Sequence, residues 1–338
     1  MSCRKLSSLI LLAAFVSVMA ACKKDDETEV LPSLSGLYFN SQNYIAPGEA
    51  VRFSPGGLAE PEGVEVGYVW KIDPSKVVSD TLEKGAIFVH WFPKDSLQTY
   101  TVTCSAVADG YYGTSYSRTI TAVKSGLDQS ITGTGIKSTD PKLTVGGVDY
   151  YYTRIGNLEW FRNNLAVTTA GVPYVNEEIM SDIYGRYYNY NDAVTACPEG
   201  WRLPSEEDWM SLAEAIESPV SDKYSVFENV AAKLYADASF NGELMQQYWP
   251  EVGDITNESK LSMLPVGFVN LGNLDNAGTY PGASFNGALE YTVFWTADKY
   301  DDEMAYYRYM ITGLPDMFPG KGDVNTFGAS VRCVRDVE

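Results

Sequence analysis

Short runs of alternating apolar and polar residues fill the first third of the chain, up to about residue 123. In the run TYTVTCSAVA, apolar side chains at Tyr100, Val102, Cys104 and Ala106 alternate with hydroxyl side chains, which is the period of a half-buried β-strand. Turn sequences rich in Gly, Pro and Asp separate the runs, so the pattern favours an all-β sandwich. The six predicted strands cover residues 35–41, 50–54, 65–72, 86–92, 99–108 and 115–123.

Two chemically reactive side chains fall within these strands. The alternation places Cys104 on the inward face, so we expect a free, buried and inert thiol. His90 lies in the strand AIFVHWF and is the one histidine of the chain. Without a second histidine or a nearby cysteine, we expect a partly exposed or hydrogen-bonded strand residue, not a metal ligand or a catalyst.

The pattern changes after residue 123. Residues 124–145 are rich in Ser, Thr, Gly and Lys, which is typical of a linker or a loosely packed strand pair. Residues 146–338 then mix strands at both ends with helices between them, which is an α+β pattern. The clearest helix is EEDWMSLAEAI at residues 206–216, with Ser205 and Asp208 forming an S-x-x-D cap. A second helix is predicted at residues 227–236 and a short one just before Cys197.

Composition and charge argue against several classes of function. The 338 residues carry 25 Lys and Arg against 44 Asp and Glu, a net charge of −19, and 45% of them are hydrophobic. Such a chain is globular, of about two domains. Its negative charge argues against binding to nucleic acid or to an anionic membrane surface, because phosphate is repelled. One histidine also excludes any site that needs paired histidines.

The first 22 residues predict export. Arg4 and Lys5 precede an apolar run at residues 9–19, which is followed by small residues and then Cys22. This order is that of a signal peptide covering residues 1–21. The ending VMAAC resembles a bacterial lipobox, which implies that Cys22 carries a lipid anchor; ordinary secretion with Cys22 as a spare thiol is the alternative.

Residues 22–33 are predicted to be a solvated acidic tether, because KKDDETE has no apolar residue to bury. A lysine followed by acidic residues resembles the surface-export signal of Bacteroidota lipoproteins. The resemblance implies attachment to the outer membrane by the lipid anchor alone, with the protein facing the cell exterior.

The sandwich sequence resembles a known module. The segments GYVWKIDP and TYTVTCSAVADGYYGTSYSRTITAV are similar to strands of a PKD-like, immunoglobulin-type domain, over residues 34–123. WKIDP stands where that family has its W-x-F-G-D-G turn. The resemblance implies a domain that spaces or presents another domain.

Several segments of residues 146–338 resemble the Fibrobacter succinogenes major paralogous domain. They are IGNLEWFRNNL, YGRYYNYNDAVTACPEGWRLPSEEDW, LPVGFVN, FWTAD and SVRCVRD. The resemblance implies a C-type-lectin-like fold, in which a disulfide ties an early helix to the last strand. Cys197 and Cys333 are the two cysteines of this region and fit that bridge; two unpaired buried thiols are the alternative. The fold class is therefore multidomain: an all-β immunoglobulin/PKD-like sandwich followed by an α+β C-type-lectin-like domain.

The acidic clusters do not predict catalysis. Glu206, Glu207 and Asp208 open a helix, and residues 301–303 are also acidic, but neither cluster has a suitably spaced His, Lys or Cys. We expect both clusters to be solvated charge. Formylglycine-generating enzymes share a related fold and use two active-site cysteines. In this chain, the two cysteines of the corresponding region are assigned to the disulfide. We therefore expect no enzymatic activity and no catalytic residue.

A ligand surface is predicted on the long loops between about residues 270 and 302. Asparagine and aspartate can hydrogen-bond hydroxyl groups, and tyrosine rings can stack on the apolar face of a sugar. The candidate residues are Asn273, Asn276, Tyr280, Asn286, Tyr300 and Asp301. The alternative is that they are turn residues and rim aromatics. C-type lectins often hold calcium with an E-P-N or Q-P-D triplet, and both are absent here, so calcium stays possible without a ligand set and no cofactor is predicted.

These observations predict a surface-exposed lipoprotein that acts as a non-catalytic binding or adhesion protein. Its partner would be a glycan or a host or neighbouring-cell surface protein. The competing hypothesis is a structural or tip subunit of a surface fibre, which requires strand donation or self-association. A polysaccharide-processing enzyme is the third hypothesis, and it requires two carboxylates facing each other across a cleft.

Overall fold

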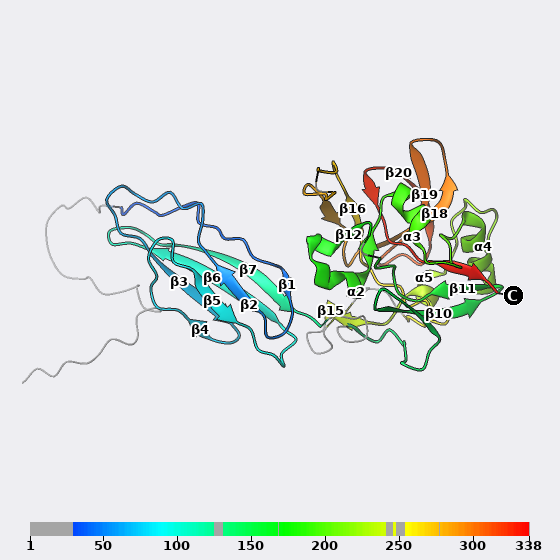
Figure 1. The fold of residues 1–338 in the computed structure, drawn as a ribbon, viewed down its shortest axis with the longest axis horizontal. Helices are drawn as coiled ribbons and strands as arrows, with labels where there is room; N and C mark the ends of the chain where they lie inside the picture. The colour runs from blue at the N-terminus through cyan, green and yellow to red at the C-terminus, as the bar shows by residue number, and fades with distance from the viewer. Residues whose placement is uncertain are drawn as a thin grey trace, which may run out of the picture.

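The computed structural model describes residues 30–124, 131–167, 169–240, 246–247, 254–276 and 278–337. The predicted signal peptide, Cys22 and most of the tether lie outside these residues. The chain is mostly β, with several sheets in two parts that follow one another along the longest axis (Figure 1). No helix in the described ranges is long and apolar enough to cross a membrane.

The N-terminal part is a β-sandwich. Its larger sheet has the order β1-β7-β6-β3-β4, and its smaller sheet pairs β2 with β5. Phe53 of the smaller sheet packs on Trp70 of the larger one with ring centroids 5.4 Å apart, so one apolar core lies between the sheets. The strands are β1 (Tyr44–Ile45), β2 (Ala50–Phe53), β3 (Gly67–Asp73), β4 (Val77–Val78), β5 (Phe88–Trp91), β6 (Thr99–Val107) and β7 (Thr114–Ala122).

The alternation predicted for the sixth strand is confirmed. In β6, the four apolar positions from Tyr100 to Ala106 are fully buried. Cys104 is free and buried, and burial raises the pKa of its thiol to about 12, so the prediction of an inert thiol fits. His90 is partly exposed between the rings of Phe88 and Phe92, and burial lowers its pKa.

The first predicted strand, residues 35–41, does not form. Only Tyr38 in this segment pairs, in a bridge with Gly56. Gly36 has a φ of +84°, which lies outside the β region, and a Cβ there would lie 2.7 Å from the carbonyl oxygen of Gly57. The edge position is taken instead by β1, which pairs in parallel with β7.

The C-terminal part is built from several small sheets. The largest has the order β22-β11-β10-β9, and two three-stranded sheets have the orders β18-β19-β20 and β17-β16-β21. Its strands are β8 (Ile131–Thr132), β9 (Lys142–Val145), β10 (Val148–Ile155), β11 (Leu158–Phe161), β12 (Val172–Pro173), β13 (Arg186–Tyr187), β14 (Ser239–Phe240), β15 (Gln246–Gln247), β16 (Phe268–Asn270), β17 (Ser284–Asn286), β18 (Tyr291–Lys299), β19 (Met304–Ile311), β20 (Phe318–Asp323), β21 (Phe327–Gly328) and β22 (Val334–Asp336).

Short helices lie between these sheets. The predicted helix forms as α4 (Glu206–Ala215), with Ser205 and Asp208 in a capping box and Trp209 fully buried. The helix before Cys197 forms as α3 (Tyr190–Ala196). The others are α2 (Ser181–Tyr184), α5 (Ala231–Leu234), η1 (Tyr174–Asn176) and η2 (Glu178–Met180).

The helix predicted over residues 227–236 is reduced to the single turn α5. Its apolar positions Phe227, Val230 and Leu234 are buried as expected. However, Phe227 pairs with Met317 as a β-bridge, and Asn229 has a φ of +58°. A tertiary backbone pairing therefore overrides the local helical pattern.

Residues 131–145, within the stretch expected to be a linker, pack into the C-terminal part. Ile131 is buried in its core, and β9 forms a hairpin with β10. The carbonyl oxygen of Thr134 accepts hydrogen bonds from Arg162 Nη2 at 3.3 Å and from Ser262 Oγ at 2.6 Å. This segment is fixed by contacts that are distant in sequence.

Glu177 joins the two parts. Its carboxylate accepts hydrogen bonds from the backbone N–H groups of Asn43 and Tyr44, both at 2.6 Å, and from Asn43 Nδ2 at 3.0 Å. Arg118 Nη2 in turn donates to Asn43 Oδ1 at 2.9 Å. Burial raises the pKa of Glu177. Because one carboxylate satisfies two backbone donors at the start of β1, the sandwich is held against the C-terminal part at a defined point.

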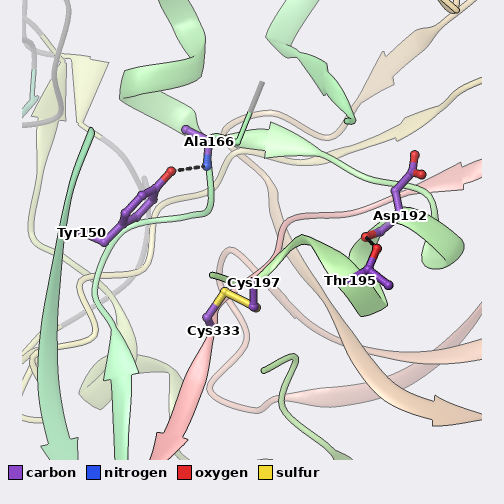
Figure 2. The surroundings of a disulfide bond; sticks show 6 residues. All are labelled: Tyr150, Ala166, Asp192, Thr195, Cys197 and Cys333. Atoms are coloured by element: carbon purple, nitrogen blue, oxygen red, sulfur yellow. Dashed lines mark hydrogen bonds between the residues drawn. A yellow bond between two sulfur atoms is a disulfide. The ribbon is translucent and has the colours of Figure 1, made fainter. Parts of the chain in front are cut away.

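The last segment of the chain closes the C-terminal part. Cys333 forms a disulfide with Cys197 at the end of α3 (Figure 2), so the predicted pairing is confirmed and the alternative of two free thiols is wrong. The neighbouring Arg332 is buried and donates to Asn164 Oδ1 and to the carbonyl oxygens of Phe161, Arg162 and Leu261. Burial lowers its pKa to about 9.

Removing this disulfide is expected to destabilise the protein strongly. The bond joins residues 136 positions apart, and the chain-entropy model assigns a loop of that length about 4 to 5 kcal/mol. We expect Cys197→Ser and Cys333→Ser each to lower the denaturant midpoint of unfolding, and a reductant to have no further effect on either variant. Midpoints equal to that of the wild type under oxidising conditions would contradict a stabilising bridge.

Candidate functional site

The structure distributes the six predicted ligand residues over three separate places. Asn273 and Asn276 are exposed on the loop that leads to β17. Tyr280 lies further along this loop and lines a cavity of about 330 Å³, where its hydroxyl accepts a hydrogen bond from Asn189 Nδ2 at 3.0 Å. Asn286 lies at the end of β17, in a different and larger cavity.

Tyr300 and Asp301 belong to the turn between β18 and β19. Asp301 Oδ1 accepts the backbone N–H groups of Glu303 and Met304 at 2.9 and 2.8 Å, so this carboxylate oxygen caps the turn. The ammonium of Lys321 lies 3.2 Å from the centroid of the Tyr300 ring and covers one of its faces. These contacts give both residues a role in the turn itself.

The larger cavity, of about 480 Å³, is an aromatic cleft. Five aromatic side chains line it, and each is partly exposed. The lining residues are Phe268, Asn286, Gly287, Glu290, Tyr291, Val293, Tyr307, Tyr309, Ile311 and Phe327. The cleft therefore combines apolar ring surface with one amide and one carboxylate, which is the usual composition of a small-ligand site.

Strand alternation builds one wall of the aromatic cleft. In β19, Tyr307, Tyr309 and Ile311 line the cleft, while Arg308 and Met310 between them are fully buried on the opposite face. In the register with β18, Tyr309 lies opposite Val293 and Ile311 lies opposite Tyr291. Two adjacent strands thus present their side chains to the same space.

Ring contacts fix the aromatic side chains. The Tyr307 ring stacks on Phe327 with centroids 4.9 Å apart, and Phe327 stacks on Phe268 at 5.4 Å. Gly320 on the neighbouring strand β20 makes room for Tyr307, since a Cβ there would lie 2.2 Å from the ring. The rings are therefore held in place by one another before any ligand arrives, which lowers the entropy that binding costs.

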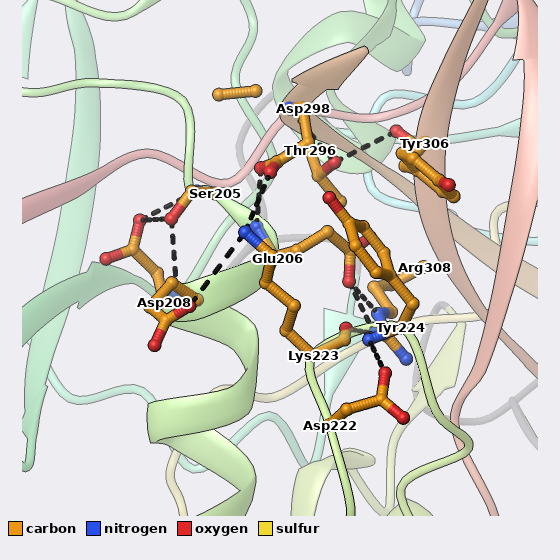
Figure 3. Close-up of polar contacts among 12 residues, drawn as sticks. Ser205, Glu206, Asp208, Asp222, Lys223, Tyr224, Thr296, Asp298, Tyr306 and Arg308 are labelled. Carbon is orange, nitrogen blue, oxygen red and sulfur yellow. Dashed lines mark hydrogen bonds and ion pairs between the residues drawn. The ribbon is translucent and has the colours of Figure 1, made fainter. Parts of the chain in front are cut away.

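A buried ion pair lies behind this wall (Figure 3). Glu206, the first residue of α4, and Arg308 of β19 are both fully buried. Arg308 Nε donates to Glu206 Oε2 at 2.7 Å, and its Nη2 donates to the same oxygen. Arg308 also donates to the carbonyl oxygens of Ser225 and Lys223, and its guanidinium lies 3.8 Å from the centroid of the Phe227 ring.

Burial shifts the ionisation of this pair. It raises the pKa of Glu206 to about 7, against the opposing effect of Arg308, and it lowers the pKa of Arg308. Glu206 Oε1 is buried and has no hydrogen-bond partner among the residues that the structure describes. The backbone N–H of Glu206 donates to Asp298 Oδ2 at 2.8 Å, which ties the start of α4 to β18. The pair therefore connects α4 to the strands of the cleft.

The expectation that the acidic start of α4 is solvated charge is wrong for two of its three residues. Glu206 is buried against Arg308, and Asp208 is buried in an ion pair with Arg202. Only Glu207 is exposed. The first turn of α4 faces the interior, which composition alone does not reveal. A usable signal was present in β19, because an arginine on the inward face of a strand needs a buried carboxylate partner.

Among the described residues, no group of three His, Cys, Asp or Glu side chains could hold a metal ion. Most rings of the aromatic cleft lie outside the loops in which ligand residues were predicted. The period-2 run MAYYRYMI, with two tyrosines on one face, was the signal that could have pointed to Tyr307 and Tyr309.

Comparison with known proteins identifies the C-terminal part. The sequence model of a protein family, the Fibrobacter succinogenes major domain, matches residues 153–335. The chain belongs to this family. The sequence-based prediction of this domain is thereby confirmed, and the matched region of the Fibrobacter succinogenes major domain contains both bridged cysteines and every residue of the aromatic cleft.

Comparisons with curated proteins and with solved structures add little to what the family match shows. No curated protein matches the chain. A solved structure of the Yersinia pseudotuberculosis adhesin InvE aligns at 11% identity over 90% of this chain and 70% of that chain, with a TM-score of 0.24. A similarity this low carries no argument, so the site of this Fibrobacter succinogenes major domain is interpreted from its own residues.

Removing one partner of the buried ion pair is expected to destabilise the protein more than replacing both partners by apolar residues. Arg308→Met alone leaves a buried carboxylate unpaired, so we expect a loss of about 3 to 5 kcal/mol in the free energy of unfolding. Arg308→Met combined with Glu206→Leu should lose less than the sum of the two single substitutions. Denaturant unfolding of all three variants measures this coupling, and purely additive losses would contradict a direct interaction.

The raised pKa of Glu206 predicts a pH dependence of stability. The folded protein binds the proton of this carboxyl more tightly than the unfolded chain, whose value is near 4.5. The contribution is therefore full below about pH 4.5 and is lost as the pH rises through about 7. The unfolding free energy of the wild type, minus that of the Glu206→Leu/Arg308→Met variant, should fall over this range. A flat or rising difference would contradict the assignment.

Proposed function

We propose that this chain is a non-catalytic surface binding protein whose C-terminal domain binds a carbohydrate in the aromatic cleft. The observation that carries the proposal is the cleft itself, in which five partly exposed rings surround a space of about 480 Å³ next to Asn286 and Glu290. Aromatic faces and edges contact the C–H groups of a sugar ring, and the amide and carboxylate can bind its hydroxyl groups. The volume is in the range typical of small-ligand sites.

The cleft supports binding more than hydrolysis. Glycoside hydrolysis by the common mechanisms needs two carboxyl groups on either side of the scissile bond. Glu290 is the single carboxylate among the residues that line the aromatic cleft. The acidic residues Glu206 and Asp208, which the sequence brought forward as a cluster, are engaged in buried ion pairs.

The arrangement of the chain suits display at a surface. The described chain enters the sandwich beside the β6–β7 turn, where Ser33 bridges to Tyr112. Strand β7 runs from this turn to the contact with the C-terminal part at its other end. In the proposal, lipid attachment at Cys22 anchors the protein to the outer membrane facing the exterior. The PKD-like sandwich then acts as a spacer for a C-type-lectin-like recognition domain.

One observation favours the second candidate, a subunit of a surface fibre. Among the described strands, β5 pairs with β2 alone, so within this part of the chain its other edge is open. The outward side chains Ile87, Val89 and Trp91 beside this edge are exposed, with Trp91 at 71%. An open edge with apolar side chains can accept a strand from another chain. Sedimentation of the purified full chain distinguishes the two functions, since a fibre subunit should self-associate and a monomeric binding protein should not.

The carbohydrate proposal is tested by binding of the purified full chain to a broad glycan panel, with calcium and then with a chelator. We expect saturable binding that Tyr309→Ala weakens about tenfold or more, equal to about 1.4 kcal/mol, because one of the aromatic rings that line the cleft is removed. Asn286→Ala should weaken it less. Tyr300→Ala is the matched control, since Tyr300 is an exposed tyrosine outside the cleft.

Three outcomes decide the proposal. Equal losses in Tyr309→Ala and Tyr300→Ala would contradict a site in the aromatic cleft. Binding that is lost with the chelator would show an ion that the described residues do not reveal. A folded chain that binds no glycan under either condition would contradict the carbohydrate proposal and favour a protein partner or the fibre subunit.

A further inference from the structure

The polar groups of the aromatic cleft restrict the kind of carbohydrate that fits it. This inference rests on the proposed function and extends it to the class of sugar. The lining contains one carboxylate, that of Glu290, and no Lys, Arg or His. An anionic group of a bound ligand therefore meets a negative charge without a neighbouring cation to compensate it.

The backbone holds Glu290 firmly, while its side chain stays exposed. Its N–H donates to the carbonyl oxygen of Gly287 at 3.0 Å, and its carbonyl oxygen accepts from the N–H of Thr312 at 2.8 Å. Within the described part of the chain, its carboxylate forms no hydrogen bond and no ion pair. Most described arginines already have an acidic or carbonyl partner elsewhere. This carboxylate is available to a ligand.

The remaining polar groups of the cleft are neutral. Asn286 Nδ2 donates to the carbonyl oxygen of Ser284 at 2.7 Å, which leaves its Oδ1 as an acceptor. Tyr291, Tyr307 and Tyr309 supply hydroxyl groups at the ends of their rings. Together with Glu290, the cleft offers more acceptors than donors, so its best partners are groups that donate: hydroxyls and ammonium groups.

Cations close to the cleft are directed elsewhere. Arg308 lies between Tyr307 and Tyr309 in sequence, but its guanidinium points to the opposite face of β19 and pairs with Glu206. Lys321 lies over the Tyr300 ring, outside the cleft. The net charge of −19 adds a general repulsion of anions.

We propose that the aromatic cleft binds neutral sugars and amino sugars, that it rejects sugars carrying carboxylate or sulfate groups, and that Glu290 determines this selectivity. A hydroxyl or an ammonium group donates to Glu290 while the apolar face of the sugar lies against the aromatic rings. An acidic sugar places its anion near the same carboxylate, and like charges in a partly desolvated site repel.

The test titrates the full chain with three β-1,4-linked oligosaccharides of equal length: one of glucose, one of glucosamine and one of glucuronic acid. We expect the glucosamine oligomer to bind at least as tightly as the glucose oligomer, and the glucuronic acid oligomer at least tenfold more weakly. Glu290→Gln should lower the affinity for the glucosamine oligomer severalfold, raise that for the glucuronic acid oligomer, and change that for glucose least. Added salt should reduce the differences.

Control variants separate this inference from the proposed function. Glu207→Gln removes an exposed carboxylate outside the cleft and should leave all three affinities unchanged, whereas Glu290→Asp should keep the wild-type order. If Tyr309→Ala abolishes binding but Glu290→Gln leaves the ratios unchanged, the selectivity proposal is overturned and the carbohydrate site stands. Equal wild-type affinity for the glucuronic acid oligomer also overturns it. Failure of all three sugars to bind overturns the selectivity proposal, and failure on the broad glycan panel as well overturns the carbohydrate proposal.

Discussion

The buried ion pair between Glu206 and Arg308 constrains how the cleft strands can sit in the C-terminal domain. Both groups are fully buried, and leaving either of these charges buried without the other is costly. Arg308 must therefore point inward toward α4, and the alternation of β19 then turns Tyr307 and Tyr309 outward into the aromatic cleft. The outward position of these cleft tyrosines is thus coupled to a polar interaction on the other side of the same strand.

Other long-range contacts make the rest of this domain rigid in the same way. Arg332 collects three carbonyl oxygens from segments far apart in sequence, and Cys333 beside it is bonded to the end of α3. The C-terminal domain has no single large sheet among its described strands, and loops separate its small sheets. These long-range contacts therefore hold the small sheets together. At the opposite end, Glu177 couples this rigid domain to the first strand of the sandwich.

Features with a local cause were predictable from the sequence. The alternation of β6 placed Cys104 inside, and the cap at Ser205 located the start of α4. Features set by distant contacts were not: the positive φ of Gly36 and the bridge of Phe227 to Met317 overrode plausible local patterns. The aromatic cleft was not predictable for a related reason, since the sequence directed attention to Asn and Tyr residues in loops. The cleft instead depends on strand register and on the ring contacts between β19 and β21, which one sequence does not display.

We propose that the rings of the aromatic cleft bind a sugar that donates a hydrogen bond to Glu290. A crystal structure of the full chain with a neutral or amino-sugar oligosaccharide at saturating concentration tests it most directly. We expect a sugar ring in contact with Tyr307 and Tyr309, with a hydroxyl or ammonium group within hydrogen-bond distance of the Glu290 carboxylate. A sugar bound in the cavity beside Tyr280, or an empty aromatic cleft in crystals of a chain that binds the same sugar in solution, would contradict it.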